Sequence, residues 1–415
     1  MGPARKRIGL VCSEPLRETM AGIGIRYFEM ARHLSREGFG IELLHPGQTP
    51  EALTSSLPGV VFETYCRSGL AQLAGRVDVV VAQGQLANDV AVALPDTPKV
   101  FDFYDPWLIE NLAYADTLGW EAFYNDLASW RLQFETGDFF ICSSQVQRQF
   151  YLGFLTALGR VHPDGIAGDP TLLGLIDVVP FGIADEIPAY RPYLPPRANE
   201  RKRILFGGLY DWYDPWTLLD ALAILEDQSW EVLFVANPNQ ETTPQKLAIE
   251  VKQWAEEKGW LGQRLKFLEW VPLDRRYDLV RDADVMVAPH TQSLETHLCM
   301  RTRYLDAIGV GCPVISSEGG TISELLGRYG AGEVVPCGEP RALALALEDI
   351  LWNGRDFGEG LSQLRKKLSW RVALQPLVNF CQSPKLDPAK KLASQAKQGR
   401  SMVQRVLARL RRLWQ

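Results

Sequence analysis

The chain has 415 residues, of which 46% are hydrophobic and 23% are charged, and its net charge at neutral pH is −6. This length is enough for about two domains of ordinary size, each with its own apolar core. The apolar and charged fractions are typical of a globular protein. The negative net charge argues against binding to bulk nucleic acid.

The seven cysteines are scattered along the chain without a C-x-x-C pair. Several stand in apolar runs, so we expect free, buried thiols in a reducing compartment. The first residues lead from basic side chains directly into a strand, which is not the pattern of a signal peptide. No apolar segment approaches the roughly 18–20 residues that span a bilayer. We therefore expect a cytoplasmic protein, free or attached to the cytosolic face of a membrane.

The first predicted strand covers residues 7–13, and a loop and a helix follow it. Gly22 and Gly24 precede this helix, whose apolar positions fall on one broad face. A glycine pair at a strand-to-helix turn often lets the backbone approach an anionic ligand closely. The alternative is that the two glycines only shape a tight turn.

Further strands in the first half are predicted from apolar runs at residues 41–46, 77–83, 99–105, 139–144 and 177–188. Asp102 and Asp105 stand at the end of one of these runs, and ligands bind at the carboxyl ends of parallel strands. The two carboxylates are therefore candidates for catalysis. The alternative is that they cap a helix or shape the turn before Pro106.

The second half repeats the alternation of strands and helices after a proline-rich, basic segment at residues 190–202 that is typical of a linker. Its predicted strands cover residues 203–208, 230–237, 264–270, 283–289 and 312–317. The two halves predict an α/β protein with two Rossmann-like, doubly wound domains that face each other across a cleft. We place these domains at residues 1–195 and 196–370.

The stretch from residue 288 to residue 326 carries most of the polar residues expected at a ligand site. It holds a charged loop, a helix predicted over 302–309, a buried strand and Gly319-Gly320 before another helix. Its candidate polar side chains are His290, Glu295, His297, Arg301, Arg303 and Asp306. A charged loop and a glycine pair at strand ends are how an α/β sheet presents a phosphate-bearing ligand. The stretch therefore predicts a nucleotide pocket.

The end of the chain differs from the rest. We expect a helix at residues 371–384 that returns toward the first domain. Residues 385–415 are basic, with Asp387 as the only acid, and apolar residues recur at helical spacing opposite arginines. This pattern is typical of an amphipathic helix at an anionic membrane surface. The alternatives are a helix packed on a partner protein and a solvated tail.

With these residues in view, the chain resembles the glycosyltransferases of the GT-B fold, particularly family 4, group 1. The resemblance extends to about residue 384 and is strongest in the run LDAIGVGCPVISSEGGTISELL at residues 305–326. By this resemblance, Asp306 stands where the family has the second acid of a Glu-x7-Glu motif, which holds the ribose of the nucleotide. The first acid of that motif would fall on Leu298, and the nearest acid is Glu295.

The family also carries an arginine and a lysine around the glycine turn that follows the first strand of the second domain. Those positions are Gly208 and Tyr213 here, so neither cation is present. A diphosphate needs compensating charge, and Arg301 and Arg303 are the nearest supply. We infer that the phosphate clamp of this chain lies on this arginine pair. The alternative is that the arginines form structural ion pairs.

The resemblance implies a transferase that moves a sugar from a nucleotide sugar to a glycan, a lipid-linked molecule or a small molecule. It implies retention of the anomeric configuration, and a basic tail that contacts a membrane favours work in cell-envelope polysaccharide or glycolipid synthesis. The amides at Gly207, Gly208, Gly319 and Gly320 would hold the donor, and Glu295 would contact its sugar. His290 and His297 are possible sugar contacts or structural side chains.

The acceptor is expected near Gly22 and Gly24, where Asp102 or Asp105 would take its proton. We expect no metal or other cofactor, because the five histidines form no cluster with ligand spacing and no Asp-x-Asp follows a strand. The arginines would stabilise the leaving diphosphate in place of a metal. The alternative function is a catalytically degenerate domain that serves as a scaffold.

Overall fold

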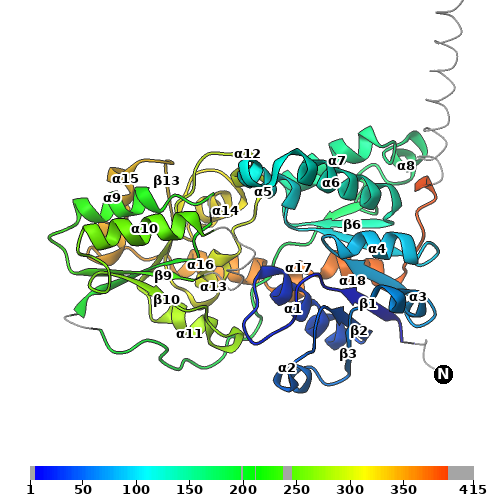
Figure 1. Ribbon diagram of the computed structural model, residues 1–415, viewed down its shortest axis with the longest axis horizontal. Helices are drawn as coiled ribbons and strands as arrows, with labels where there is room; N and C mark the ends of the chain where they lie inside the picture. Colours follow the sequence, from blue (N-terminus) through cyan, green and yellow to red (C-terminus); the bar gives the residue numbers. More distant parts are fainter. Residues whose placement is uncertain (1–4, 198–199, 211, 237–244, 391–415) are drawn as a thin grey trace, which may run out of the picture.

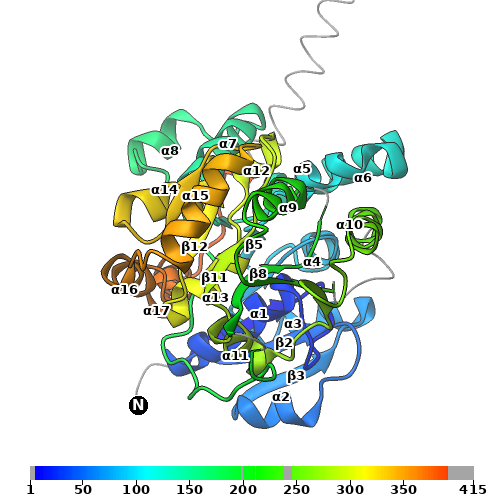
Figure 2. The same cartoon turned by 90° about the vertical axis from the view of Figure 1, so that its left-hand side faces the viewer.

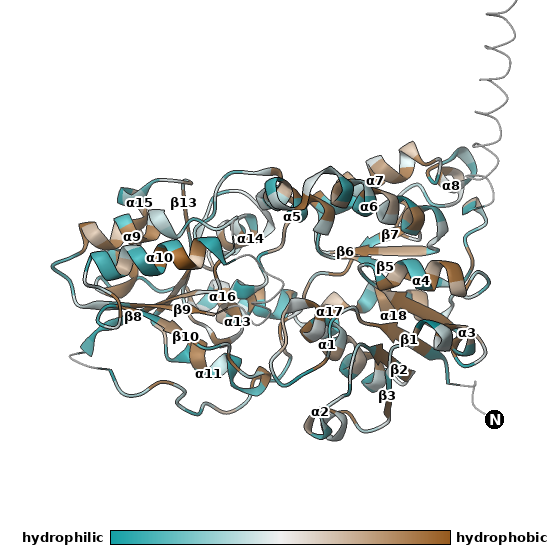
Figure 3. Ribbon diagram, in the orientation of Figure 1, coloured by the Kyte–Doolittle hydropathy of each residue, from teal (hydrophilic) through white to brown (hydrophobic). Residues whose placement is uncertain are grey.

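The computed structural model describes residues 5–197, 200–210, 212–236 and 245–390. They form two α/β lobes that lie next to each other along the long axis of the molecule (Figure 1). The amino-terminal half of the chain makes one lobe and residues 202–367 make the other. Hydrophobic residues are concentrated in the strands inside each lobe (Figure 3).

The first lobe contains a parallel sheet with the strand order β3-β2-β1-β4-β5-β6-β7 among the described residues. The strands are β1 (Arg7–Val11), β2 (Gly40–His45), β3 (Val60–Thr64), β4 (Val79–Ala82), β5 (Lys99–Phe103), β6 (Phe139–Cys142) and β7 (Ile176–Val178). All residues of β4 and β5 are buried, as expected for central strands covered by helices on both faces.

The helices of the first lobe connect these strands in the right order for parallel pairing. They are α1 (Gly22–Arg36), α2 (Glu51–Ser56), α3 (Leu70–Leu73), α4 (Leu86–Ala93), α5 (Trp107–Asn111), α6 (Ala115–Thr136), α7 (Gln145–Ala157) and α8 (Pro163–Gly168). Helix α7 begins after Ser144, whose hydroxyl accepts a hydrogen bond from the amide of Gln147 at 3.1 Å. A cap of this kind stabilises a helix by about 1 kcal/mol.

The second lobe contains a parallel sheet with the order β10-β9-β8-β11-β12-β13. The strands are β8 (Lys202–Gly207), β9 (Trp230–Val235), β10 (Leu265–Leu268), β11 (Val285–Val287), β12 (Val314–Ser317) and β13 (Glu333–Val335). The helices are α9 (Pro215–Ile224), α10 (Lys246–Glu257), α11 (Arg276–Arg281), α12 (Leu294–Leu298), α13 (Arg303–Val310), α14 (Thr321–Tyr329), α15 (Pro340–Leu351) and α16 (Gly358–Lys367). Helices α9 and α15 pack together on one side of the sheet, and α11 and α13 pack together on the other (Figure 2).

After the second lobe, the chain returns to the first lobe through α17 (Trp370–Ala373) and α18 (Gln375–Gln382). The amide of Ile183 donates to the carbonyl of Leu368 at 2.8 Å, and the amide of Trp370 donates to the carbonyl of Ile183 at 3.0 Å. The ring of Phe380 stacks on Phe139 of β6 at 4.7 Å. The crossover is therefore packed against the first lobe, with α17 beside α1 (Figure 1).

The structure confirms two doubly wound, parallel-sheet domains, but three details differ from the sequence predictions. The edge strands β3 and β13 were not predicted, because they are short and only partly buried. The strand expected at residues 177–188 is limited to β7 at Ile176–Val178. Cys66 is exposed and Cys337 is half-buried, whereas the other five cysteines are buried and all seven are free.

The predicted boundary between residues 195 and 196 falls in the segment that joins β7 to β8, and the one at residue 370 falls at the crossover. Most of the predicted basic tail, residues 391–415, lies outside the described residues. In the part of the chain that the structure describes, no helix has the length and apolar character needed to cross a membrane.

Candidate functional site

A cleft of about 1080 Å³ lies between the two lobes and receives residues from both. In each sheet the strand order reverses between two central strands, β1 and β4 in the first and β8 and β11 in the second. Ligands of open parallel sheets bind at the carboxyl ends of strands at such reversals. Ser13 and Glu14 follow β1, Gly207 and Gly208 stand at the end of β8, and all four line the cleft. The ligand-binding edges of the two sheets therefore face the same cleft.

Arg303 lies against the glycine turn at the end of β8. Its Nη1 donates to the carbonyl oxygens of Phe206 at 3.1 Å and Gly208 at 2.6 Å. Its guanidinium carbon is 3.7 Å from the centre of the Tyr213 ring. A side chain at Gly207, where φ is +90°, would place its Cβ 3.1 Å from this nitrogen. The glycine turn therefore leaves room for the arginine, as well as adopting a backbone conformation that disfavours other residues.

Arg301 lies on the same tyrosine, 5.1 Å from the ring centre. Its Nη1 and Nη2 donate to the two carboxylate oxygens of Glu295 at 2.7 and 2.5 Å, and Nη2 also donates to the hydroxyl of Thr296 at 3.1 Å. Tyr213 is the residue that replaces the lysine expected from the family resemblance. Both arginines therefore contact the tyrosine that stands in place of the family's lysine.

Glu295 is buried, and both of its carboxylate oxygens are held by Arg301. It lines the cleft, but its charge is already neutralised by a bidentate ion pair. This pairing differs from the predicted role as a free carboxylate against the donor sugar. The geometry fits better a residue that orients Arg301.

Asp306, on α13, lines the cleft and lies 3.2 Å from the guanidinium of Arg276, the first residue of α11. Burial is the main cause that raises the pKa of Asp306, and the positive charge of Arg276 opposes it. Arg276 was not predicted from the sequence. A residue on a short helix after a loop gives no motif that would have pointed to it.

Gly319 and Gly320 have φ values of +91° and +82° at the start of α14. A Cβ at Gly320 would lie 2.6 Å from the carbonyl oxygen of Thr296, so glycine is needed for this close approach of two backbones. Neither residue is among those that line the cleft. The close approach packs α14 against α12, and the contact of these two glycines with phosphate stays a prediction.

The two candidate histidines also lie apart from the cleft lining. His290 is buried at the end of β11, and burial, followed by the charge of Arg301, lowers its pKa to about 4. It is therefore a neutral imidazole. His297 is exposed on α12. These positions favour structural roles for both over contact with a sugar.

The first lobe contributes carboxylates to the cleft. Asp105 accepts a hydrogen bond from Nε2 of Gln83 at 3.0 Å, and burial, followed by the negative charge of Asp102, raises its pKa to about 7. Glu110, on α5, was not predicted, and burial, followed by Asp105, raises its pKa to about 8. Each is therefore positioned to exchange a proton near neutral pH.

Asp102 is placed differently from the prediction. Its carboxylate is fully buried and accepts two hydrogen bonds from Arg26, at 2.7 and 3.0 Å. Arg26 also donates to the carbonyl oxygens of Val179 and Pro180. Asp102 does not line the cleft. Asp102 and Arg26 form an ion pair that joins β5 to α1. Neither partner has a free position for a substrate, so the pair is structural.

The glycine turn before α1 also differs from the prediction. The amides of Ala21 and Gly24 donate to the two carboxylate oxygens of Glu14, at 3.1 and 2.7 Å. The positive end of this helix is thus already neutralised by a carboxylate of the chain itself. Gly22 lines the cleft and allows the close approach of the Tyr104 hydroxyl. A phosphate is not needed to complete this turn.

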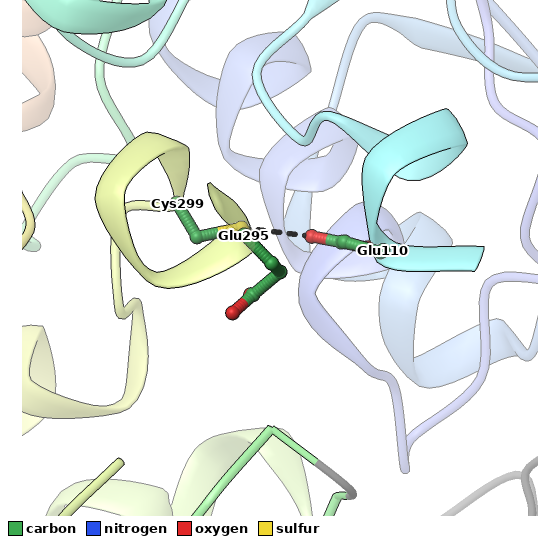
Figure 4. Close-up of side chains that lie close together, drawn as sticks. All are labelled: Glu110, Glu295 and Cys299. Atoms are coloured by element: carbon green, nitrogen blue, oxygen red, sulfur yellow. Dashed lines mark hydrogen bonds between the residues drawn. The ribbon is translucent and has the colours of Figure 1, made fainter. Parts of the chain in front are cut away.

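Glu110 reaches across the cleft to the second lobe (Figure 4). Its Oε1 accepts a hydrogen bond from the thiol of Cys299 at 2.9 Å. Burial raises the pKa of this thiol. Among the described residues, Glu110, Glu295 and Cys299 are a group whose ligand atoms lie close enough to hold a metal ion. The carboxylate of Glu295 turns away toward Arg301, and the guanidinium charge beside it disfavours a cation.

Aromatic rings close the cleft on one side. Trp212 stacks on Tyr210 at 5.0 Å and meets the ring of Tyr114 from the first lobe at 6.0 Å. Trp216 instead packs edge-to-face with Trp254 and does not line the cleft. Trp212 is therefore placed to contact a ligand, whereas Trp216 is not.

Glu14, Glu110 and Arg276 line the cleft and were not predicted. Glu14 stands three residues after the end of β1, so the rule that singled out Asp102 and Asp105 at a strand end applies to it as well. Glu110 and Arg276 stand on helices, and only the arrangement of the two lobes brings them to the cleft.

Residues 201–353 match the sequence profile of the family described as Glycosyl transferases group 1. This region contains the whole of the second sheet and the two arginines around Tyr213. No curated protein sequence gives a significant match to the chain.

Solved structures match almost the whole chain at low sequence identity. HepE of Anabaena, in complex with UDP and glucose, has a TM-score of 0.67 and 16% identity over 91% of this chain and 100% of its own. Sucrose-phosphate synthase of Thermosynechococcus elongatus has a TM-score of 0.63 and 16% identity over 91% and 99%. An E. coli structure described as trehalose-6-phosphate bound with UDP-2-fluoro glucose has a TM-score of 0.61 and 12% identity over 92% and 100%. At these identities the similarity is one of fold.

Proposed function

We propose that the chain is a glycosyltransferase with the GT-B fold that transfers a sugar from a nucleotide sugar to a glycan or lipid-linked acceptor; the match of residues 201–353 to the group 1 profile and the similar solved structures support this. The observation that carries this proposal is the arginine pair around Tyr213 at the end of β8. The similar structures of HepE and of the E. coli protein contain UDP with glucose or a UDP-sugar, which supports a nucleotide-sugar donor here.

The donor's diphosphate would bind at the glycine turn, between Arg303 and Arg301. Within the described residues no carboxylate ion pair engages Arg303, whose Nη1 is held by two carbonyl oxygens. It therefore retains its positive charge for a ligand. Arg301 lines the same cleft; its Nη1 and Nη2 are held by Glu295, and its Nε is buried without a partner in the described part of the chain. Guanidinium groups match the planar, bidentate geometry of phosphate oxygens.

The chemistry needs negative charge to be stabilised on the departing diphosphate. As the bond from the sugar's anomeric carbon to the diphosphate breaks, charge develops on the oxygen that leaves. Preorganised cations in a site shielded from water stabilise that charge strongly. In this proposal the arginines perform this task without a resident metal ion. Glu295 is a positioning residue that orients Arg301.

The acceptor would enter from the first lobe, beside Asp105 and Glu110. A hydroxyl oxygen of the acceptor forms the new bond to the anomeric carbon, and its proton passes to a carboxylate. We assign that step to Glu110, because its carboxylate contacts the Cys299 thiol of the second lobe (Figure 4). The anomeric configuration would be retained, as the family resemblance implies.

The setting that we propose is the synthesis of a cell-envelope polysaccharide or glycolipid at the cytosolic face of a membrane. The support is the basic, amphipathic sequence of residues 385–415. Full-length chain should sediment with vesicles that contain anionic lipid and not with neutral vesicles, and a chain ending at residue 384 should bind neither. Equal binding of the two proteins to anionic vesicles would contradict a role of the tail in membrane binding.

A donor screen tests the proposed reaction directly. Wild-type protein and the Arg303→Ala variant are incubated with UDP-, GDP- and dTDP-sugars, and release of the nucleoside diphosphate is measured. We expect one class of donor to be hydrolysed slowly and the variant to lose this activity. Failure of wild-type protein to bind any nucleotide in calorimetry would instead support a scaffold.

A further inference from the structure

The thiol of Cys299 joins the two walls of the cleft. Cys299 follows α12 in the second lobe, and Glu110 belongs to α5 in the first lobe. The two helices pack against each other, and both residues line the cleft. The Sγ of Cys299 donates a hydrogen bond to Oε1 of Glu110 at 2.9 Å (Figure 4).

This hydrogen bond fixes the Glu110 carboxylate. Within the described residues, no other side chain or amide donates a hydrogen bond to it. The charged groups that act on it from nearby are Asp105, Glu295 and Arg301. A glutamate side chain has several rotatable bonds, so a carboxylate without a partner samples several positions. The thiol therefore selects one of these positions.

The neighbouring carboxylate, Asp105, is held in a different way. It accepts a hydrogen bond from Nε2 of Gln83 at 3.0 Å, and Gln83 accepts one from the hydroxyl of Ser13 at 2.7 Å. These three residues all belong to the first lobe, so the position of Asp105 does not depend on the second lobe. Glu110, in contrast, receives its hydrogen bond from the opposite wall.

The environment of Cys299 keeps its sulfur a hydrogen-bond donor. The residue is only 7% exposed, and burial raises the pKa of its thiol, so the proton stays on the sulfur. A neutral thiol is a weak hydrogen-bond donor, and an ionised acceptor strengthens the bond. The thiol can therefore hold the Glu110 carboxylate without adding a charge to the cleft.

Cys299 also belongs to the segment that carries the proposed diphosphate clamp. Its amide donates to the carbonyl oxygen of Glu295 at 2.8 Å, and Arg301 stands two residues further along the chain. Glu295 and Arg301 form the bidentate ion pair described above. Residues 295–301 therefore connect the clamp on the second wall to the carboxylate on the first wall.

Resting on the proposed function, we infer that Cys299 is a positioning residue for proton transfer. Its thiol holds the Glu110 carboxylate across the cleft, so the proton acceptor is in place only when the second wall stands against the first. Reaction rates fall steeply when a reacting group is displaced by as little as about 1 Å. The thiol thus couples the assembly of the two walls to proton transfer.

The test is the hydrolysis of nucleotide sugars, in which water takes the place of the acceptor. Full-length protein is incubated with UDP-, GDP- and dTDP-glucose, and release of the nucleoside diphosphate is measured for the compound that wild type hydrolyses fastest. Cys299→Ala should lower kcat about tenfold and leave KM and nucleotide affinity unchanged, because the carboxylate is misplaced while the arginines stay. Cys299→Ser keeps a hydrogen-bond donor at this position and should restore most of the rate.

A double-mutant cycle tests whether the thiol acts through Glu110. In the Glu110→Gln background, Cys299→Ala should have no further effect, since an amide takes no proton wherever it lies. Cys312→Ala is the matched control, because Cys312 is also a buried thiol of the second lobe but does not line the cleft. It should leave kcat unchanged.

Three results would overturn the role of the thiol and leave the transferase proposal intact. They are an unchanged kcat in Cys299→Ala, an equal loss in Cys299→Ser, and a full additional loss from Cys299→Ala in the Glu110→Gln background. If wild-type protein neither binds nor hydrolyses any of the three nucleotide sugars, both the proposed function and this inference fail.

Discussion

The two walls of the cleft carry different charges. The wall from the first lobe presents the carboxylates of Glu14, Asp105 and Glu110, and the wall from the second lobe presents Arg276, Arg301 and Arg303. On the second wall the carboxylates that are present, Glu295 and Asp306, each lie beside an arginine. On the first wall Arg17 is the lining residue with a positive charge.

This difference explains how one cleft handles two substrates with opposite needs. Cations on the second wall suit the phosphates of a donor. Burial without a paired cation raises the pKa of Asp105 and Glu110 toward neutrality, which suits carboxylates that exchange protons with a hydroxyl. The comparison predicts that variants of the second wall damage donor use and variants of the first wall damage proton transfer.

The largest effect is expected from Arg303→Ala. Removal of this guanidinium leaves developing charge on the diphosphate without its nearest unpaired cation, and kcat/KM should fall about 10²- to 10³-fold. Nucleotide affinity should fall with it. Arg341→Ala, an exposed arginine on α15, serves as the control and should have no effect. Unchanged kinetics of the Arg303→Ala enzyme would contradict the proposal that the second wall binds the donor's phosphates.

Glu110→Gln should lower kcat by about tenfold to hundredfold and leave nucleotide affinity unchanged, because the amide loses the basicity of the carboxylate but keeps an oxygen that can accept from the Cys299 thiol. Wild-type kcat should rise with pH through the range from about 7 to 8, where Asp105 and Glu110 ionise. In the variant, the midpoint of this rise in kcat should move toward pH 7, the pKa of Asp105. Glu121→Gln, on the exposed side of α6, controls for loss of charge. An unshifted limb would show that another group takes the proton.

Glu295→Gln tests whether this residue positions Arg301 or attacks the sugar itself. A positioning role predicts a loss of about tenfold, mostly in KM for the donor, because the guanidinium stays but loses its bidentate partner. A nucleophile would lose kcat far more severely than Arg303→Ala does. Steady-state kinetics on both variants separates the two outcomes.

The smallest effect concerns stability. The carboxyl of Glu110 ionises near its ordinary pKa of about 4.3 in the unfolded chain and near 8 in the folded protein. Between these values the folded state binds more protons, so its stability falls as pH rises and is constant above the folded pKa. Glu110→Gln should therefore be more stable than wild type at pH 8.5, by on the order of 1–2 kcal/mol after solvent screening, and the gain should shrink near pH 5. Urea unfolding at both pH values measures it, and a gain that does not depend on pH would contradict the cause.

Much of the fold was predictable because its central strands are continuous apolar runs. Residues 79–82 and 99–103 are buried on both faces, and such runs are easily recognised. The edge strands β3 and β13 were missed because one face of each meets solvent and their apolar pattern is brief.

The second wall of the site was also partly predictable. Arg301, Arg303 and Asp306 follow strand β11 within one stretch of sequence, and all three line the cleft. The sequence could not predict which charged side chains pair with each other. No rule of sequence spacing encodes the contacts that the structure shows. Glu295 is bound to Arg301, Asp102 is bound to Arg26, and Glu14 is bound to the amides of the α1 turn. These pairings decide which charges remain free for a substrate.

The most direct measurement is a crystal structure of the protein with a bound nucleotide sugar or nucleoside diphosphate. The arrangement around Tyr213 predicts that Arg303 lies within about 2.7–3.2 Å of a diphosphate oxygen at the glycine turn of β8. A nucleotide bound elsewhere, with Arg303 still donating only to the carbonyls of Phe206 and Gly208, would contradict the assignment of the second wall to the donor.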